Sequence, residues 1–181
     1  MNQLIRSGYN GLGSLCFVLA LLFLGTTACQ ASSSAVTHSV TAVVPSILSL
    51  TTSTGAMAFN FSDYLSGTDS AVVTGSYTVK ANTMTTTGHI DAVLSAPITG
   101  MDFKADPQSY SSTSGSAGFS EAYSGYSTVA GTAVKMYNQS GGASAATANG
   151  TFTVNYKFTA TTDLAANTYG PVTLSVTLYN T

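Results

Sequence analysis

The sequence predicts an all-β protein built as an antiparallel β-sandwich. Short segments rich in β-branched and aromatic residues alternate apolar with polar side chains, the pattern of strands that bury one face. Clusters of Gly, Ser, Asn and Asp separate these segments, and after residue 34 there is almost no helical periodicity. Half-buried strands joined by turns favour antiparallel sheets, because parallel sheets need helical crossovers and are buried on both faces.

The N-terminal half supplies five segments with this pattern. The first alternates apolar and polar residues until Pro45 interrupts it, and the second resumes an apolar face. In the third, the apolar residues Met57, Phe59 and Phe61 alternate with Ala58 and Asn60. The predicted strands cover residues 36–43, 47–50, 57–61, 72–80 and 89–94.

The C-terminal half begins with residues 106–125, which are rich in Ser, Gly and Tyr and show no clear period, so we expect a long exposed loop there, alone or with one irregular strand. Residues 129–137 predict a strand, and residues 141–150 a loop of small residues. The last two strands, 152–158 and 172–178, have the clearest alternation. Together the chain predicts an immunoglobulin-like sandwich of about seven to nine strands.

The N-terminus is typical of a secretory signal. Arg6 precedes an apolar run at 15–24, and small residues follow it as far as Ala31. The run is shorter than the roughly 20 residues that a membrane span requires, and no second apolar stretch follows, so no transmembrane span is expected. The sequence therefore predicts a signal peptide at 1–31 and a single exported domain at 32–181.

Residues 25–29 resemble the lipobox at which bacterial lipoproteins are cut and lipidated. Cleavage there would occur before Cys29 and would attach lipid to that cysteine, although the usual Leu three residues earlier is Thr26 here. Ordinary cleavage after Ala28 or Ala31 is the alternative. The only other cysteine, Cys16, lies inside the signal, so the exported domain is expected to contain no disulfide.

Charge is sparse, which narrows the classes of partner. The chain has five Lys and Arg residues against seven Asp and Glu residues, and its one arginine, Arg6, lies in the signal. Nucleic acids are gripped mainly through clusters of basic residues, so a nucleic-acid partner is not expected. The abundance of Ser and Thr suits a protein of the extracellular or bacterial cell surface.

No catalytic apparatus is visible, so the sequence predicts no enzyme and no cofactor. A nucleophile would need a base beside it, and the only histidines, His38 and His89, lie in no recognisable motif. Glu121 is the only glutamate, so paired carboxylates for sugar hydrolysis would have to come from scattered Asp residues.

Two pairs of aspartates have side chains that could act as calcium ligands. Neither spacing matches a calcium-binding loop, and a lysine stands between the members of one pair. Turn-forming and solvated aspartates are the simpler interpretation, so no metal is predicted. The pairs are Asp63 with Asp69 and Asp102 with Asp106.

Four aromatic residues in and just after the 106–125 segment predict a ligand-contact loop. Exposed aromatic rings can stack on sugars or form an adhesive patch, although packing of the segment on its own sheet is the favoured explanation of these residues. This gives one candidate function, a surface-anchored lipoprotein that binds glycans or a protein partner. The residues are Tyr110, Phe119, Tyr123 and Tyr126.

The extended segment from Ser32 to Val44 gives a second candidate function. Its valines Val36, Val40 and Val43 could pair within their own domain or be added to the open sheet edge of a neighbour. Head-to-tail contacts of the second kind do not close and therefore make fibres.

Four stretches resemble the spore-coat-U-like pilin domain of archaic chaperone–usher fimbriae. They correspond to that family's first strand, a Phe- and Tyr-containing strand and loop, a Gly-centred strand and the last strand. Where the family has cysteines after its first and Gly-centred strands, this chain has Ser46 and Ala81. The stretches are residues 40–45, 59–67, 73–79 and 166–178.

This resemblance implies a structural subunit of a surface fibre or fimbria. Assembly would occur by donor-strand complementation, with Val36, Val40 and Val43 as donor residues. The implied partners are further copies of the chain or other fimbrial subunits, and a periplasmic chaperone.

Overall fold

The computed structural model describes residue 39, residues 41–142 and residues 146–180. The chain divides into two units, Met1–Val43 and Val44–Thr181. Most of the first unit, including most of the predicted strand 36–43, lies outside the described residues, and its described residues form no strand. The fold described below is that of the second unit.

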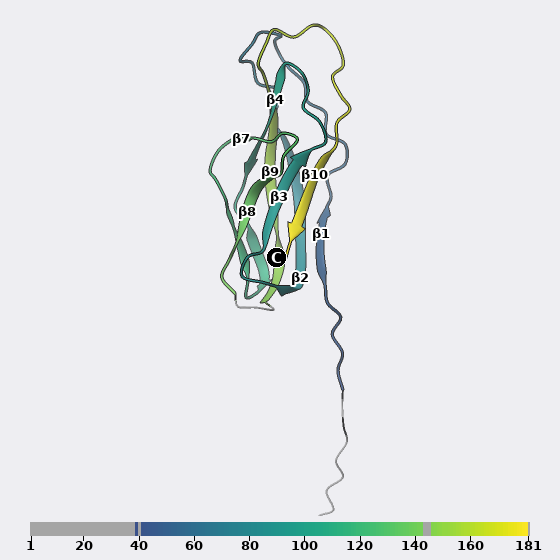
Figure 1. The fold of residues 1–181 in the computed structure, drawn as a ribbon, viewed down its shortest axis with the longest axis vertical. Coiled ribbons are helices and arrows are strands. Elements are labelled where there is room, and N and C mark those ends of the chain that lie inside the picture. The colour runs from purple at the N-terminus through teal and green to yellow at the C-terminus, as the bar shows by residue number, and fades with distance from the viewer. Residues whose placement is uncertain (1–38, 40, 143–145, 181) are drawn as a thin grey trace, which may run out of the picture. The chain divides into compact units, whose positions relative to one another are not determined.

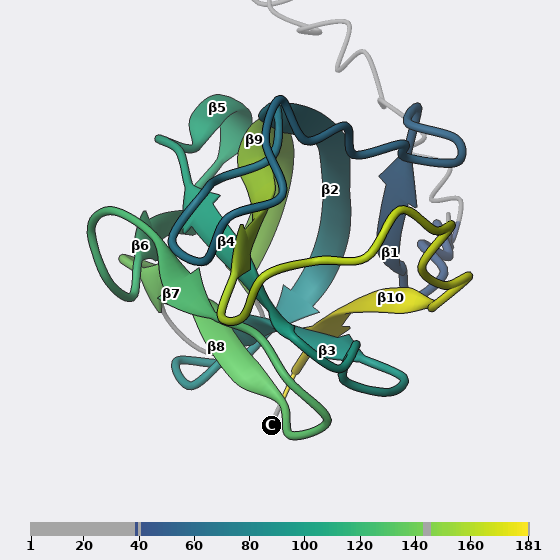
Figure 2. The same ribbon diagram turned by 90° about the horizontal axis from the view of Figure 1, so that it is seen from above.

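The Val44–Thr181 unit is an all-β sandwich of two antiparallel sheets, as the sequence predicts (Figure 1). One sheet has the order β1-β2-β9-β4-β7, with β5 also paired to β9, and the other has the order β10-β3-β8-β6. Figure 2, viewed nearly along the strands, shows the two layers. The ten strands are β1 (Leu48–Thr52), β2 (Val73–Met84), β3 (His89–Leu94), β4 (Met101–Pro107), β5 (Ser111–Gly115), β6 (Gly118–Glu121), β7 (Ser127–Thr128), β8 (Val134–Ser140), β9 (Ala146–Ala160) and β10 (Leu174–Tyr179).

The longest strand, β9, is the centre of the first sheet. Its fifteen residues alternate buried with less buried positions along the whole length, so one face lines the core. Strand β2 pairs along one edge of β9. Strands β4 and β5 share the other edge, β4 opposite residues 154–160 and β5 opposite residues 148–151.

Aromatic rings from both sheets fill the core. Phe103 of β4 stacks on Tyr156 of β9 at 5.4 Å between centroids, and Tyr77 of β2 stacks on Phe152 of β9 at 5.0 Å. Tyr137, from the opposite sheet, packs against Phe152 at 4.6 Å. Burial raises the pKa of the Tyr137 and Tyr156 hydroxyls far above the ordinary value, and each has a hydrogen-bond partner.

Gly75 of β2 explains how two tyrosines fit beside one strand. A Cβ atom at this position would lie 2.9 Å from the Tyr156 ring and 3.0 Å from the Tyr77 ring. The hydroxyls of those tyrosines are hydrogen-bonded to each other at 2.9 Å inside the core, so the rings cannot easily move aside. Only glycine leaves room for both.

Most predicted strands are present, with shifted ends. The predicted strands at 47–50, 72–80 and 89–94 correspond to β1, β2 and β3, and the final two correspond to β9 and β10. The strand predicted at 129–137 lies instead at 134–140 as β8.

The strand predicted at 57–61 is absent. Residues 53–60 form no strand, and Phe61 makes a single bridge to Ser70. The alternation is nevertheless real, because the apolar side chains of this segment pack on the core, with Phe59 edge-on to Phe158 at 5.1 Å. The segment buries one face without a neighbouring strand to pair with.

The long exposed loop predicted at 106–125 is wrong, and β4 is an unpredicted strand. Residues 106–125 contain the end of β4 and all of β5 and β6. Every residue of β5 is exposed, so its Ser-rich sequence has no apolar period and its pairing to β9 rests on the backbone. In the same way, the loop predicted at 141–150 ends where β9 begins at Ala146.

Replacement of Gly75 by alanine tests the close packing of the tyrosine pair. We expect Gly75→Ala to lower the free energy of unfolding by about 1–3 kcal/mol, the usual cost of overpacking a core. The matched control is Gly131→Ala, because a Cβ atom there would meet no atom within 4 Å. Urea unfolding of both variants measures the difference, and equal stabilities would contradict the packing described for Gly75.

Candidate functional site: an open edge between strands β1 and β10

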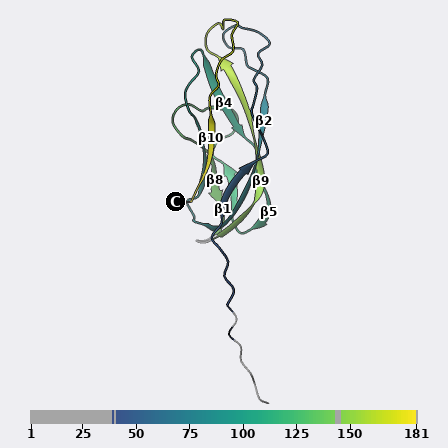
Figure 3. The ribbon, with the colours of Figure 1, turned by 90° about the vertical axis from the view of Figure 1, so that its right-hand side faces the viewer.

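Strands β1 and β10 are the edge strands of the two sheets on the same side of the sandwich (Figures 1 and 3). In the part of the chain that the structure describes, β1 pairs only with β2 and β10 pairs only with β3. The two edge strands lie near each other, but no backbone ladder joins them. The sandwich is therefore open along this side.

The two edge strands run in opposite directions. Just before β1, the carbonyl of Ile47 accepts a hydrogen bond from the amide of Asn82 at 3.0 Å. Just after β10, the Asn180 side chain donates to the carbonyl of Thr83 at 2.7 Å. The start of β1 and the end of β10 thus meet the same end of β2, which makes the strands antiparallel across the gap.

The hydrogen bonds at the ends of β1 fix which backbone groups face the gap. Ile47 bonds to Asn82, and Ser53 bonds to Ser76, so the odd-numbered residues of this strand are paired with β2. In an antiparallel ladder, residues alternate between pointing toward the partner and pointing away. The amides and carbonyls of the even-numbered residues Leu48, Leu50 and Thr52 therefore point toward the open side.

The same reasoning applies to β10. The Ser95 amide donates to the carbonyl of Thr173 at 2.8 Å, so odd-numbered residues of this strand are paired with β3. The backbone groups of Leu174, Val176 and Leu178 point away from β3, toward the open side. Both edges thus present unpaired backbone groups to the same gap.

The apolar side chains at this edge are incompletely covered. Leu50, Leu174 and Val176 pack on the core but are only partly buried. By contrast, Val79 in β2 and Val154 in β9, which lie inside a sheet, are fully buried. The core therefore lacks cover where a further strand would lie.

A groove follows part of the gap and continues beyond the strands. The part between the end of β1 and the start of β10 has a volume of about 470 Å³, and an adjoining larger part, between the segments that follow β1 and precede β10, has a volume of about 1150 Å³. The two share Gly55, Met57 and Leu174 in their linings. Residues 55–64 and 164–174 form the walls of the larger part, and core side chains such as Phe103 form its floor.

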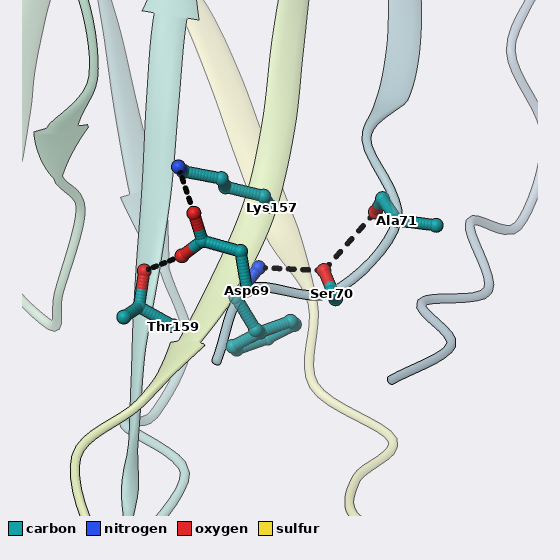
Figure 4. A network of polar contacts seen from close by, with 6 residues as sticks. Asp69, Ser70, Ala71, Lys157 and Thr159 are labelled. Carbon is teal, nitrogen blue, oxygen red and sulfur yellow. Dashed lines mark hydrogen bonds and ion pairs between the residues drawn. The ribbon is translucent and has the colours of Figure 1, made fainter. Parts of the chain in front are cut away.

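A polar network attaches Asp69 and Ser70, which follow the groove wall formed by residues 55–64, to strand β9 (Figure 4). Asp69 accepts hydrogen bonds from the Lys157 ammonium at 2.5 Å and from the Thr159 hydroxyl at 2.6 Å. Ser70, which is buried, donates its amide to the Phe158 carbonyl and accepts the Phe158 amide on its hydroxyl. The network holds the loop that includes the groove wall against the sheet.

The hydrogen bonds and charges of this network lower the pKa of the Asp69 carboxyl group. The hydrogen bonds from Lys157 and then Thr159 hold the pKa of Asp69 below its ordinary value of 3.8. The Lys157 ammonium also lies 4.2 Å from the centroid of the Tyr126 ring. Its positive charge is therefore stabilised by both the Asp69 carboxylate and the face of the Tyr126 ring.

The predicted donor and lipidation residues lie mostly beyond what the structure describes. Val36, Val40 and Cys29 are outside the described residues. Val43 is described and is 85% exposed.

The four aromatic residues predicted to contact a ligand do not form one exposed patch. Phe119 is in the core, and Tyr110 packs edge-on against it at 5.3 Å between centroids. The Tyr123 hydroxyl is buried without a hydrogen-bond partner among the described residues, and burial raises its pKa to about 12. Tyr126 is the most exposed of the four, at 37%.

The other candidate chemical groups are scattered. His89 stacks on Tyr179 at 4.9 Å, and its Nε2 atom lies 3.7 Å from a carboxylate oxygen of Asp91. Among the described residues, no group of three or more His, Cys, Asp or Glu side chains could hold a metal ion. His38 lies outside the described residues. The feature that sequence reasoning missed is the groove, because no local pattern signals which strands end a sheet.

Comparisons of this chain with family models, with curated proteins and with solved structures find no match. The described residues also contain no helix that is long and apolar enough to cross a membrane.

Hydrogen exchange tests the assignment of the open edge. We expect the amides of Leu174 and Val176 to exchange much faster than those of Ser175 and Thr177, because only the second pair is bonded to β3. Exchange followed by NMR on the isolated subunit resolves the individual amides. Equal protection along β10 would contradict an open edge.

The Asp69–Lys157 pair predicts a pH dependence. Because the pKa of Asp69 is lowered in the folded state, its stabilising effect is present above the unfolded pKa and is lost as the pH falls through the folded pKa. The gap in urea midpoint between the native chain and Asp69→Asn should therefore shrink as the pH falls below 3.8. In a Lys157→Gln background the gap should already be small at neutral pH, and an unchanged gap would contradict the pairing.

Proposed function

We propose that this protein is an exported structural subunit of a bacterial surface fibre or fimbria. In this proposal the segment Ser32–Val44 of one copy fills the groove of the next as an additional β-strand. The observation that carries the proposal is the open edge between β1 and β10, where both sheets end in unpaired backbone groups above an exposed part of the core.

The edges themselves support pairing with another strand. Proteins usually protect edge strands with charged residues, proline or very short strands. At the far edges of the two sheets, β7 has two residues, and β6 has four and includes Glu121. At the open side, β1 and β10 have the sequences LSLTT and LSVTLY, without a charge or a proline. Strand β5 (SSTSG) is also an edge strand without charge or proline, but all of its residues are exposed and it leaves no apolar side chain uncovered. The edges beside the groove combine free backbone groups with partly uncovered core side chains.

The N-terminal segment has the chemistry that the groove requires. Residues 32–44 contain no Asp, Glu, Lys or Arg, and their one titratable side chain is His38, so insertion with a neutral histidine buries no charge. Their β-branched sequence supplies backbone groups for the ladder. In a strand, Val36 and Val40 lie on one face and supply apolar side chains to the groove, whereas Val43 lies on the opposite face. Donor and groove are thus complementary in both hydrogen bonding and polarity.

A subunit of this kind needs protection before assembly, because its groove exposes apolar surface and free backbone groups to any other chain. A periplasmic chaperone that covers the groove until the next subunit arrives is therefore part of the proposal.

The alternative of a glycan-binding lipoprotein has less support. Phe119 and Tyr110 pack in or against the core, and the Tyr123 hydroxyl is buried.

Deletion of residues 32–44 tests the proposal. The shortened chain should keep its fold but remain a soluble single subunit, because it has a groove and no donor strand. Sedimentation and negative-stain electron microscopy give the readout. A synthetic peptide of residues 32–44 should bind to the shortened chain and protect the amides of Leu174 and Val176 from exchange. Filaments of normal length from the deleted chain would rule the mechanism out.

Matched substitutions in the donor segment sharpen this test. Val40→Asp should abolish assembly, because it would place a charge on the apolar floor of the groove. Thr41→Asp adds the same charge one residue along, on the opposite face of the strand, and should assemble much more readily. Equal effects of the two substitutions would indicate that the segment does not bind as a strand.

A further inference from the structure

The outer face of the first sheet concentrates charge in a domain that otherwise has little. Along β4, Asp102, Lys104 and Asp106 alternate with buried residues, so their side chains point away from the core. Lys157 of β9 lies on the same face, between two buried neighbours, and holds Asp69 there. This face thus carries five of the eleven charged side chains that follow residue 31.

Four polar or aromatic residues form one row across this face. The register of β4 with β7 continues by one residue to place Tyr126 opposite Asp106. Asp106 pairs with Asn155 of β9, which in turn pairs with Thr74 of β2. Residues directly opposite one another in an antiparallel sheet share a face. Because neighbouring strands lie about 4.8 Å apart, the row is about 14 Å long, the size of a short oligosaccharide.

Tyr126 supplies an aromatic ring to this row. Its side chain is 37% exposed, and the Lys157 ammonium lies 4.2 Å from the ring centroid. The Lys157 side chain rises from the sheet and is only 17% exposed, so the ring lies over the ammonium and turns its opposite face to solvent. Burial raises the pKa of the Tyr126 hydroxyl, and the charges of Lys157, Asp106 and Asp69 also act on it, so all three lie near the ring.

The polar groups of the row have unused hydrogen-bonding capacity. The Thr74 hydroxyl donates to the amide oxygen of Asn155 at 2.8 Å, and the Asn155 amide nitrogen has no acceptor among the described residues. The Asp106 carboxylate and the Lys104 ammonium likewise form no ion pair or hydrogen bond within the described part of the chain. Donors and acceptors are therefore available beside an exposed ring.

This combination of groups selects the chemistry of a partner. A protein interface has an apolar centre, whereas this face offers one ring among charges and amides. An anionic ligand is disfavoured, because the three carboxylates of the face outnumber its two ammonium groups. A neutral sugar matches both features, since its hydroxyls bond to carboxylate, amide and ammonium groups and its C–H face packs on an aromatic ring.

We propose that Tyr126, Asp106, Asn155 and Lys104 form a binding site for a neutral oligosaccharide on the outer face of the first sheet. The Tyr126 ring packs on the apolar face of one pyranose ring. The Asp106 carboxylate accepts hydrogen bonds from sugar hydroxyls, and Asn155 and Lys104 donate to them. Of the four aromatic residues predicted to contact a ligand, only Tyr126 takes part, and it acts with residues of β4 and β9.

The site goes beyond the proposed function and does not depend on assembly. None of its residues lines the groove, so it stays available when the groove is filled. If the chain forms fibres as proposed, each copy adds one site. Many weak sites on one fibre then bind a glycan-covered surface far more tightly than one subunit does.

Saturation-transfer difference NMR tests the site, because it detects a weakly bound sugar on a protein in any state of assembly. The native chain is mixed in turn with lactose, maltose, mannobiose and chitobiose, and with sialic acid as the anionic control. At least one neutral disaccharide should receive saturation, most strongly at the ring protons of its apolar face. Saturation of none of the four, or of sialic acid alone, would overturn the proposal.

Substitutions then locate the binding. Tyr126→Ala and Asp106→Asn should each weaken binding of the responding disaccharide by about tenfold, through loss of the ring contact or of a charge-assisted hydrogen bond. The matched control is Tyr179→Ala, because Tyr179 is 39% exposed and belongs to the opposite sheet. Binding that is unchanged in both site variants, or equally weakened in Tyr179→Ala, would contradict the assigned site.

Filament formation gives an independent readout. Both site variants should assemble normally, because neither residue lines the groove, and normal filaments also show that the variants fold. Filaments of the native chain that bind no sugar would overturn the sugar site and leave the proposed function intact. Sugar binding by a native chain that never assembles would overturn the fibre proposal and support the site.

Discussion

The structure depends on the pairing of β9 along both of its edges. Strand β2 occupies one edge, and β4 with β5 occupies the other, so the fifteen residues of β9 hold the first sheet together. The inward face of β9 also supplies Phe152, against which Tyr137 of the opposite sheet packs. Because β9 is fully paired and β2 lies between β9 and β1, incomplete pairing is confined to the outer strands.

Incomplete pairing is tolerated differently at the two sides of the sandwich. At one side the sheets end in the short strands β6 and β7, which offer little backbone to another chain. At the other side they end in β1 and β10, which are uncharged and leave Leu174 and Val176 partly uncovered. Covering these side chains would stabilise the domain by about 25 cal/mol for each Å² of apolar surface removed from water. Under the proposed function, the inserted segment of another copy supplies that cover.

Local alternation predicted the fold class and the strongest strands but could not supply their partners. The alternation at 152–158 identified β9 because half of its residues face the core. At 57–61 the same alternation was misleading, since a segment can bury one face without pairing. Strand β4 was not predicted, because its outward residues Asp102, Lys104 and Asp106 are charged and their pattern was interpreted as that of turn-forming, solvated residues. The donor valines are visible in the sequence, whereas the groove depends on which strands end each sheet, and pairing between distant segments leaves no local signal.

The strands of the Val44–Thr181 unit run roughly along one common direction (Figure 1). In a fibre assembled as proposed, the inserted segment would lie along that same direction, and tension on the fibre would pull it lengthwise through the groove. Its hydrogen bonds to β10 are perpendicular to the strand, so such a pull would load them together in shear rather than one after another. Each junction would then resist extension as a unit, which is the mechanical property that a filament anchored against flow needs.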